Sequence, residues 1–142
     1  MKTNVVYTAD EVLEALMAIP FPNPRKKLVY IAGPYGRRIN NSDAQCEANV
    51  KEVIKAARHL IILGHIPFPA NIYHFVHSGW LASPTEDVWL EICMAWIPFC
   101  DTLLRLPGKS HGADAEVKLA ESLGIPVAYS FTELGDITQK YP

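Results

Sequence analysis

From residue 28 onward, short apolar segments rich in β-forming residues alternate with amphipathic helical segments. This alternation constrains the fold more than any other feature of the sequence. The expected strands are residues 28–32, 65–68, 101–106 and 125–129, and the expected helices are 43–63, 83–99 and 113–123, with a short helix or turn from 132. Such alternation is typical of βαβ units, whose strands are parallel and whose helices cover both faces of the sheet. We therefore predict a three-layer, doubly wound parallel α/β sheet of the flavodoxin or Rossmann type.

Length and charge limit the classes of function. The chain has 142 residues, which is enough for one domain, and a formal net charge of −2. That balance argues against a nucleic acid polymer or an anionic membrane as the partner and leaves a small molecule. No apolar leader or membrane-length segment is visible, and the three cysteines, Cys46, Cys93 and Cys100, have no disulfide or zinc spacing. We expect a cytoplasmic protein with reduced thiols and no bound metal.

The N-terminal part of the chain is an addition to this domain. Residues 8–11 form a capping box that predicts a helix start, and Pro20, Pro22 and Pro24 end that helix. Residues 1–27 are therefore interpreted as a helical appendage and a proline-rich linker, and residues 28–142 as a single α/β domain.

The first cluster of polar residues follows the first strand. In a doubly wound sheet, ligands bind beyond the carboxyl ends of the strands, where we expect the loops 33–42, 69–83 and 107–112. Glycines allow the backbone to approach a ligand closely, and arginines present fixed forks to phosphate. The cluster is Gly33, Pro34, Tyr35, Gly36, Arg37 and Arg38. A plain strand-ending turn with solvated arginines is an equally favoured interpretation.

The second cluster opens the helix that follows the third strand. Ser110 lies near its N-cap, so Gly112 and its neighbours present free amides and the positive end of the helix dipole to a ligand. Glu116 lies a turn and a half further on and could project toward the same site. On spacing alone, an exposed glutamate that pairs with Lys109 or Lys118 is the more common arrangement.

The remaining candidates lie between these two clusters. Among the acids of the 83–99 helix, Glu91 is expected to face inward because Leu90 and Ile92 flank it, whereas Glu86 and Asp87 fit a solvated face. The segment 69–85 is expected to be irregular, and a loop of this length is usually functional. His74 in this loop could contact phosphate or gate the site, although packing is the commoner role of such a residue. Trp80 and Trp89 are expected in the core rather than stacked on a base.

Taken together, the motifs resemble the nucleoside 2-deoxyribosyltransferase superfamily, which includes deoxynucleoside monophosphate N-glycosidases and uncharacterised relatives. The matching residues span 28–129 and comprise Val29–Tyr35 (VYIAGPY), Gly64–Pro69 (GHIPFP), Cys100–Asp101, the S-x-G-x-x-x-E element of residues 110–116, and Leu123–Val127 (LGIPV). The order and spacing of these pieces carry the resemblance, and the S-x-G-x-x-x-E element has the most weight.

The resemblance implies that Glu116 is a nucleophile that attacks the anomeric carbon of a nucleoside or its 5′-monophosphate and displaces the base. It further implies that Tyr35 orients Glu116 or lines the sugar pocket. Ser110 and Gly112 would hold the 5′ end of the sugar, helped by Arg37 or Arg38. No cofactor is needed, and the relatives predict a homo-oligomer.

The chain also departs from the family pattern. Cys93 stands where the transferases and monophosphate glycosidases carry an aspartate, so the base-contacting role is assigned to Glu91. The C-terminal motif with which the transferases complete a neighbouring site is not evident in residues 136–142. Hydrolysis is therefore favoured over base exchange. Two alternatives remain: a nucleotide-sensing module without catalysis, and an assembly protein whose N-terminal helix mediates contacts.

Overall fold

The computed structural model describes residues 7–18, 27–36 and 42–140. Its centre is a four-stranded sheet in the order β2-β1-β3-β4, formed by β1 (Leu28–Ala32), β2 (Ile66–Pro69), β3 (Thr102–Arg105) and β4 (Val127–Ala128). Every neighbouring pair of strands is parallel, and Tyr30 on β1 lies opposite Phe68 on β2 and Leu103 on β3. The predicted parallel sheet is confirmed.

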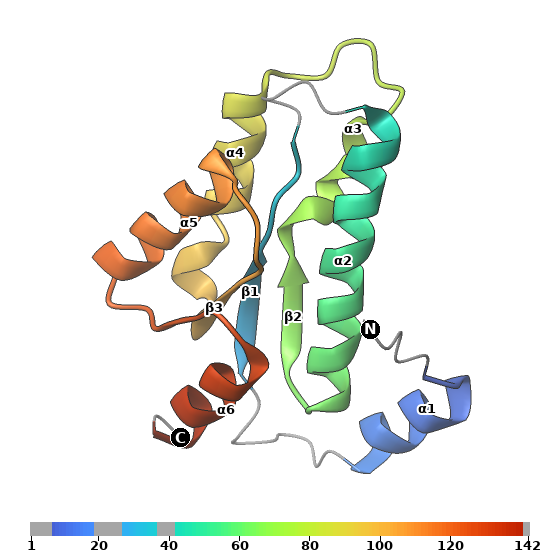
Figure 1. The fold of residues 1–142 in the computed structure, drawn as a ribbon, viewed down its shortest axis with the longest axis vertical. Coiled ribbons are helices and arrows are strands. Elements are labelled where there is room, and N and C mark those ends of the chain that lie inside the picture. Colours follow the sequence, from blue (N-terminus) through green and yellow to red (C-terminus); the bar gives the residue numbers. More distant parts are fainter. Residues whose placement is uncertain (1–6, 19–26, 37–41, 141–142) are drawn as a thin grey trace.

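Helices cover both faces of this sheet (Figure 1). On one face, Val29 and Ile31 pack with α2 (Asp43–Ile62) and α6 (Phe131–Lys140). On the other face, Tyr30 and Ala32 pack with α4 (Glu86–Met94) and α5 (His111–Ser122). Successive residues of a strand point to opposite faces, so the apolar run of β1 supplies both halves of the core. The three-layer architecture is thereby confirmed.

The helix boundaries follow local capping signals to different extents. Helix α2 matches the expected range because Ser42 and Gln45 form a reciprocal capping box at its start. Helix α4 differs from the prediction at both ends. Its N-cap is Thr85 instead of Ser83, whose hydroxyl accepts a hydrogen bond from the Trp89 indole (3.0 Å). It ends at Met94, and Pro98 lies in a separate 3₁₀ turn, η3 (Ile97–Phe99).

The segment after β2 is more regular than the sequence predicts. The expected irregular loop instead contains a 3₁₀ turn, η2 (Ala70–Tyr73), and one α-helical turn, α3 (His74–His77). Ala70, His74 and His77 are all buried, so tertiary packing stabilises these turns although the segment has no helical periodicity.

The N-terminal helix α1 (Ala9–Ala18) lies against α2. Its capping box forms as predicted: the Thr8 amide donates to Glu11 Oε2 (2.7 Å), and the Glu11 amide donates to Thr8 Oγ1 (3.2 Å). Just before the helix, the Tyr7 hydroxyl lies 3.1 Å from Nδ1 of His59 on α2. The predicted prolines of the linker lie outside the described residues. None of the helices in the described ranges is both long and apolar enough to cross a membrane.

Two leucines test the contribution of the sheet core to stability. Leu104 on β3 is 1% exposed, whereas Leu81 is 104% exposed. We expect Leu104→Ala to lower the free energy of unfolding by about 2–5 kcal/mol, because it removes buried methyl groups and leaves a cavity. The matched control Leu81→Ala should change it by no more than about 0.5 kcal/mol. Urea unfolding of both variants measures the difference, and equal effects would contradict this assignment of the core.

Candidate functional site

A pocket of about 300 Å³ lies beyond the carboxyl ends of the strands. It is lined by the loop after β1, the η2–α3 segment, one face of α4 and the first turns of α5. The order of the strands reverses between β1 and β3, and the connections that leave these two strands diverge at that point. The pocket therefore occupies the position where open α/β sheets bind their ligands.

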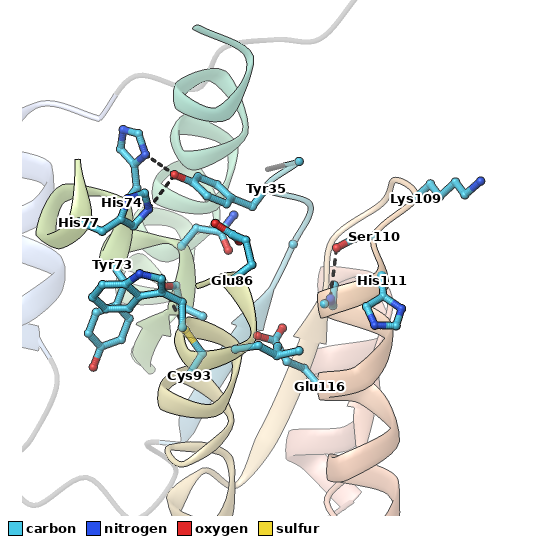
Figure 2. Close-up of a pocket in the computed structure, with 18 residues that line it drawn as sticks. Tyr35, Tyr73, His74, His77, Glu86, Cys93, Lys109, Ser110, His111 and Glu116 are labelled. Carbon is cyan, nitrogen blue, oxygen red and sulfur yellow. Dashed lines mark hydrogen bonds between the residues drawn. The ribbon is translucent and has the colours of Figure 1, made fainter. Parts of the chain in front are cut away.

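Glu116 on α5 reaches into this pocket from one side (Figure 2). It is 6% exposed, and its Oε1 accepts a hydrogen bond from the Tyr30 hydroxyl at 2.8 Å. Burial raises the pKa of Glu116 from 4.5 to about 7, although the Tyr30 hydrogen bond and the positive charge of Arg105 both act to lower it. A carboxyl group with this pKa is a functional-site candidate on physical grounds.

Tyr30 is the partner of Glu116 that sequence reasoning missed. It lies in the middle of β1, is fully buried, and is the one residue of that strand with a polar side chain. Burial, and then the charge of Glu116, raise the pKa of Tyr30 well above its usual value, so the phenol remains a hydrogen-bond donor. The signal available in the sequence was a single hydroxyl inside an apolar strand, which must find a partner when buried.

Tyr35 lies apart from the position expected for a residue that orients Glu116. It lines the pocket, but its hydroxyl lies 2.5 Å from Nδ1 of His74 and 2.9 Å from Nε2 of His77. Figure 2 shows these three side chains together on the wall opposite α5. The orienting contact to Glu116 comes from Tyr30, and the interpretation of Tyr35 as that contact is wrong.

Helix α4 forms another wall of the pocket through Glu86, Trp89, Leu90 and Cys93. These positions share one face of a helix that begins at Glu86. Glu91 is rotated away from that face, and its side chain is exposed and does not line the pocket. The prediction that Glu91 is the inward acid of this helix is therefore wrong, and Glu86, which was expected on a solvated face, lines the pocket.

The remainder of this wall is apolar and aromatic. Trp89 packs against Tyr73, with 5.7 Å between the ring centroids, and both residues line the pocket. Trp89 is thus half-buried at the site, whereas Trp80 is 49% exposed, so neither lies in the core as expected. Burial, and then the charge of Glu116, raise the pKa of Cys93 to about 12. Its thiol is neutral near pH 7 and is a poor proton donor there.

The start of α5 closes the site. The Ser110 hydroxyl caps the helix by accepting from the Ala113 amide (3.1 Å), and Ser110 and Gly112 both line the pocket. Just before them, buried Arg105 at the end of β3 donates to the Gly108 carbonyl (2.8 Å) and contacts Asp114 Oδ1 (3.0 Å). These contacts tie the loop after β3 to the first turn of α5.

Gly108 brings the loops after β1 and β3 together. Its φ is +118°, and a Cβ atom at this position would lie 2.7 Å from Cγ of Pro34. A side chain there would therefore be strained and would clash with the neighbouring loop.

The structure thus brings most of the predicted site residues into one pocket. Those that line it are Gly33, Tyr35, Gly36, His74, Ser110, Gly112 and Glu116. Pro34 packs beside the pocket, and Arg37 and Arg38 lie outside the described residues. Among the residues that the structure describes, no group of three or more histidine, cysteine or acidic side chains is arranged to hold a metal ion.

Comparisons with known proteins identify the family and the fold. The model of the family described as "Domain of unknown function (DUF4406)" matches residues 27–129. A solved structure of a 2-deoxyribosyltransferase from Bacillus psychrosaccharolyticus is similar, with a TM-score of 0.52 and 21% sequence identity, over 70% of this chain and 69% of that chain. None of the curated proteins matches. The chain therefore has a nucleoside 2-deoxyribosyltransferase-like fold.

Titration of Glu116 should make the stability of the protein depend on pH. Because its folded pKa is raised, its contribution to stability is present below the unfolded pKa of about 4.5 and is lost as the pH rises through about 7. Relative to Glu116→Gln, the wild type should lose up to about 3 kcal/mol of unfolding free energy between pH 4.5 and pH 8.5. Urea unfolding at both pH values measures this change. Glu121→Gln, at an exposed position of the same helix, is the control, and its difference from the wild type should stay within about 0.5 kcal/mol.

Loss of the Tyr30 hydroxyl should raise the pKa of Glu116 further. Tyr30→Phe removes a hydrogen bond that favours the ionised carboxylate and leaves the ring in place. Carbon-13 NMR of the glutamate carboxyl groups, with Glu116→Gln to assign the signal, measures the shift. Tyr129→Phe, at an exposed tyrosine, is the control. An unchanged or lower pKa in Tyr30→Phe would show that this bond does not stabilise the ionised form.

Proposed function

The chain belongs to the DUF4406 family and has a nucleoside 2-deoxyribosyltransferase-like fold, and from this premise we propose that it cleaves the N-glycosidic bond of a nucleoside or its 5′-monophosphate. The observation that carries the proposal is the buried Glu116 carboxyl group, held by the Tyr30 hydroxyl inside a pocket at the carboxyl edge of the sheet. The similar solved structure is a 2-deoxyribosyltransferase, an enzyme of this reaction class.

In the proposed reaction, a Glu116 oxygen attacks the anomeric carbon of the sugar. The bond between this carbon and the base nitrogen breaks, and its electron pair leaves with the base. The transition state resembles an oxocarbenium ion, so the adjacent carboxylate stabilises its positive charge and then forms a covalent glycosyl-enzyme. Water attacks the same carbon in the second step and releases Glu116.

The ionisation of Glu116 fits a nucleophile that works near neutral pH. Burial weakens the solvation of its carboxylate, while Tyr30 and Arg105 limit the rise of its pKa to about 7. A carboxyl group with a pKa near 7 can carry the reactive carboxylate near neutral pH before substrate binds. Tyr30 holds one carboxylate oxygen, so it positions the group for attack through the other oxygen.

The remaining walls of the pocket suit a nucleotide. The aromatic surface of Trp89 and Tyr73 is a platform on which a base can stack. The amides at the start of α5, together with Ser110 and Lys109, suit the 5′ end of the sugar or its phosphate. Arg37 and Arg38 are proposed as further phosphate contacts. The resemblance also supports a homo-oligomer, and the scattered cysteines, which lack disulfide spacing, support a cytoplasmic location.

A second candidate function is nucleotide binding without turnover. Cys93 stands where the resembling transferases and monophosphate glycosidases carry an aspartate, its thiol is neutral near pH 7, and Glu91 does not enter the pocket. A module of this kind would keep the pocket and bind nucleotides without breaking them.

Base release decides between the two candidates. A panel of nucleosides and 5′-monophosphates should yield free base with the wild type, and Glu116→Gln should lower kcat/KM by at least about 10³-fold because the nucleophile is lost. The kcat/KM should also fall as the pH drops below about 7, where Glu116 is protonated. The control Glu121→Gln should match the wild type.

The other outcomes have separate meanings. Binding of a nucleotide without release of its base, with and without an acceptor base, would favour the binding module. Release that is unchanged in Glu116→Gln would reject Glu116 as the nucleophile. Equal affinity for nucleosides and their monophosphates would reject the 5′-phosphate site.

A further inference from the structure

Glycosidic cleavage in this pocket requires a source of protons that the Glu116 chemistry does not provide. A departing base is a poor leaving group unless one of its ring nitrogens or its carbonyl oxygen is protonated, and general acid catalysis typically contributes 10²–10⁴-fold. Glu91 is exposed outside the pocket, and the Cys93 thiol holds its proton too tightly. The proton must therefore come from another part of the wall.

We propose that Glu47, His74, Tyr35 and His77 form a proton relay and that His77, at its pocket end, is the catalytic acid that protonates the leaving base. This inference rests on the proposed function. The four residues come from α2, from α3 and from the loop after β1, and the close-up shows the Tyr35 hydroxyl between the two imidazole rings (Figure 2). Nothing in the sequence motifs places these residues together.

Short polar contacts join three of the four residues, and Glu47 lies beside them at the surface. Glu47 Oε1 lies 3.9 Å from His74 Nε2, with 57% of the Glu47 side chain exposed. His74 Nδ1 lies 2.5 Å from the Tyr35 hydroxyl, and that hydroxyl lies 2.9 Å from His77 Nε2. The two histidines are 3% and 8% exposed, so bulk water has little access to the inner links.

The proton count allows two arrangements of this network. The Tyr35 hydroxyl has one proton, so it donates to one histidine and accepts from the other. In the loaded arrangement, His74 is an imidazolium beside the Glu47 carboxylate and donates through Nδ1 to Tyr35, which donates to His77 Nε2. His77 then carries its own proton on Nδ1. Both contacts of the Tyr35 hydroxyl are then satisfied.

Transfer converts this arrangement into the second one. His77 gives its Nδ1 proton to the base and accepts the hydroxyl proton of Tyr35 on Nε2. Tyr35 in turn accepts the Nδ1 proton of His74. The base gains one proton and His74 loses one, so the charges balance. In the resulting arrangement Tyr35 donates to His74 and accepts from His77, and the hydrogen bonds are again satisfied. After the products leave, water in the open pocket returns a proton to Nδ1 of His77, and the same transfers run in reverse until His74 is again the imidazolium beside Glu47.

Tyr35, His74 and His77 all line the pocket, and His77 lies beside the place where a base would bind. His77 lines the pocket, and its ring centroid is 5.5 Å from that of Trp89, the proposed stacking platform. A base stacked on Trp89 would have one edge toward His77. Glu86 lines the same pocket and is the competing acid.

Two leaving groups separate proton donation from every other role of these residues. One substrate is the nucleoside or nucleotide found in the base-release panel, and the other is the matching 4-nitrophenyl 2-deoxyriboside, whose phenolate leaves without a proton. We expect His77→Gln to lower kcat/KM for the base by 10²–10⁴-fold and Tyr35→Phe to lower it by at least tenfold. Both variants should release 4-nitrophenol within about threefold of the wild type, which also shows that their sites are folded.

Matched variants define the controls. His65→Gln and Tyr129→Phe make the same substitutions outside the pocket and should leave both rates unchanged. Glu116→Gln should abolish both reactions, because both need the nucleophile.

Three results would overturn the relay. One is an equal loss of both reactions in His77→Gln and Tyr35→Phe, which would assign these residues a structural role. Another is that Glu86→Gln loses activity toward the base-releasing substrate but keeps it toward the 4-nitrophenyl substrate, while His77→Gln shows no such difference. This result would assign the catalytic acid to Glu86. The third is failure of the wild type to release either leaving group, which would reject the proposed function and the relay with it.

Discussion

The structure depends on the divergence of two neighbouring parallel strands. Strands β1 and β3 pair along their length, but the chain leaves β1 toward α2 on one face and leaves β3 toward α5 on the other. No helix can then cover the carboxyl edge between them, and the pocket forms there. The pocket lets polar side chains gather at the edge of an otherwise apolar core. The close approach of Gly108 to Pro34 joins the two loops across it, and Arg105 ties the loop after β3 to the first turn of α5.

Within that pocket, a buried carboxyl group is kept at a cost to stability. Glu116 lies among apolar neighbours of α5 and the sheet, where burial disfavours its charged form. Tyr30 and Arg105 recover part of this cost by favouring the ionised group. Sites that destabilise the fold and are held in place by the surrounding structure are typical of functional positions. The same reasoning applies to His74 and His77, which are buried polar residues that share one tyrosine hydroxyl.

The predictability of the site differs from residue to residue. Spacing alone favoured an exposed Glu116, and its place in the site was implied by the family resemblance. In the structure, Ser110 caps the start of α5, and Glu116 lies on the buried side of that helix. Glu91 was expected to face inward because Leu90 and Ile92 flank it, but neighbouring residues of a helix point about 100° apart, so apolar flanks do not predict an inward side chain. The pocket face of α4 follows from the three- and four-residue spacing of Glu86, Leu90 and Cys93, which leaves Glu91 outside the pocket.

What the sequence determined by itself is what local signals encode. The alternation of apolar and amphipathic segments specified the parallel sheet and its two helical layers, and the capping boxes marked the starts of α1 and α2. The tertiary structure alone decided the partners of the functional side chains. The Tyr30–Glu116 hydrogen bond joins residues 86 positions apart, and Tyr35 meets His77 across 42 positions. Such contacts leave no periodic trace in the chain, because they arise only when the packing of the sheet and its helices brings distant segments together.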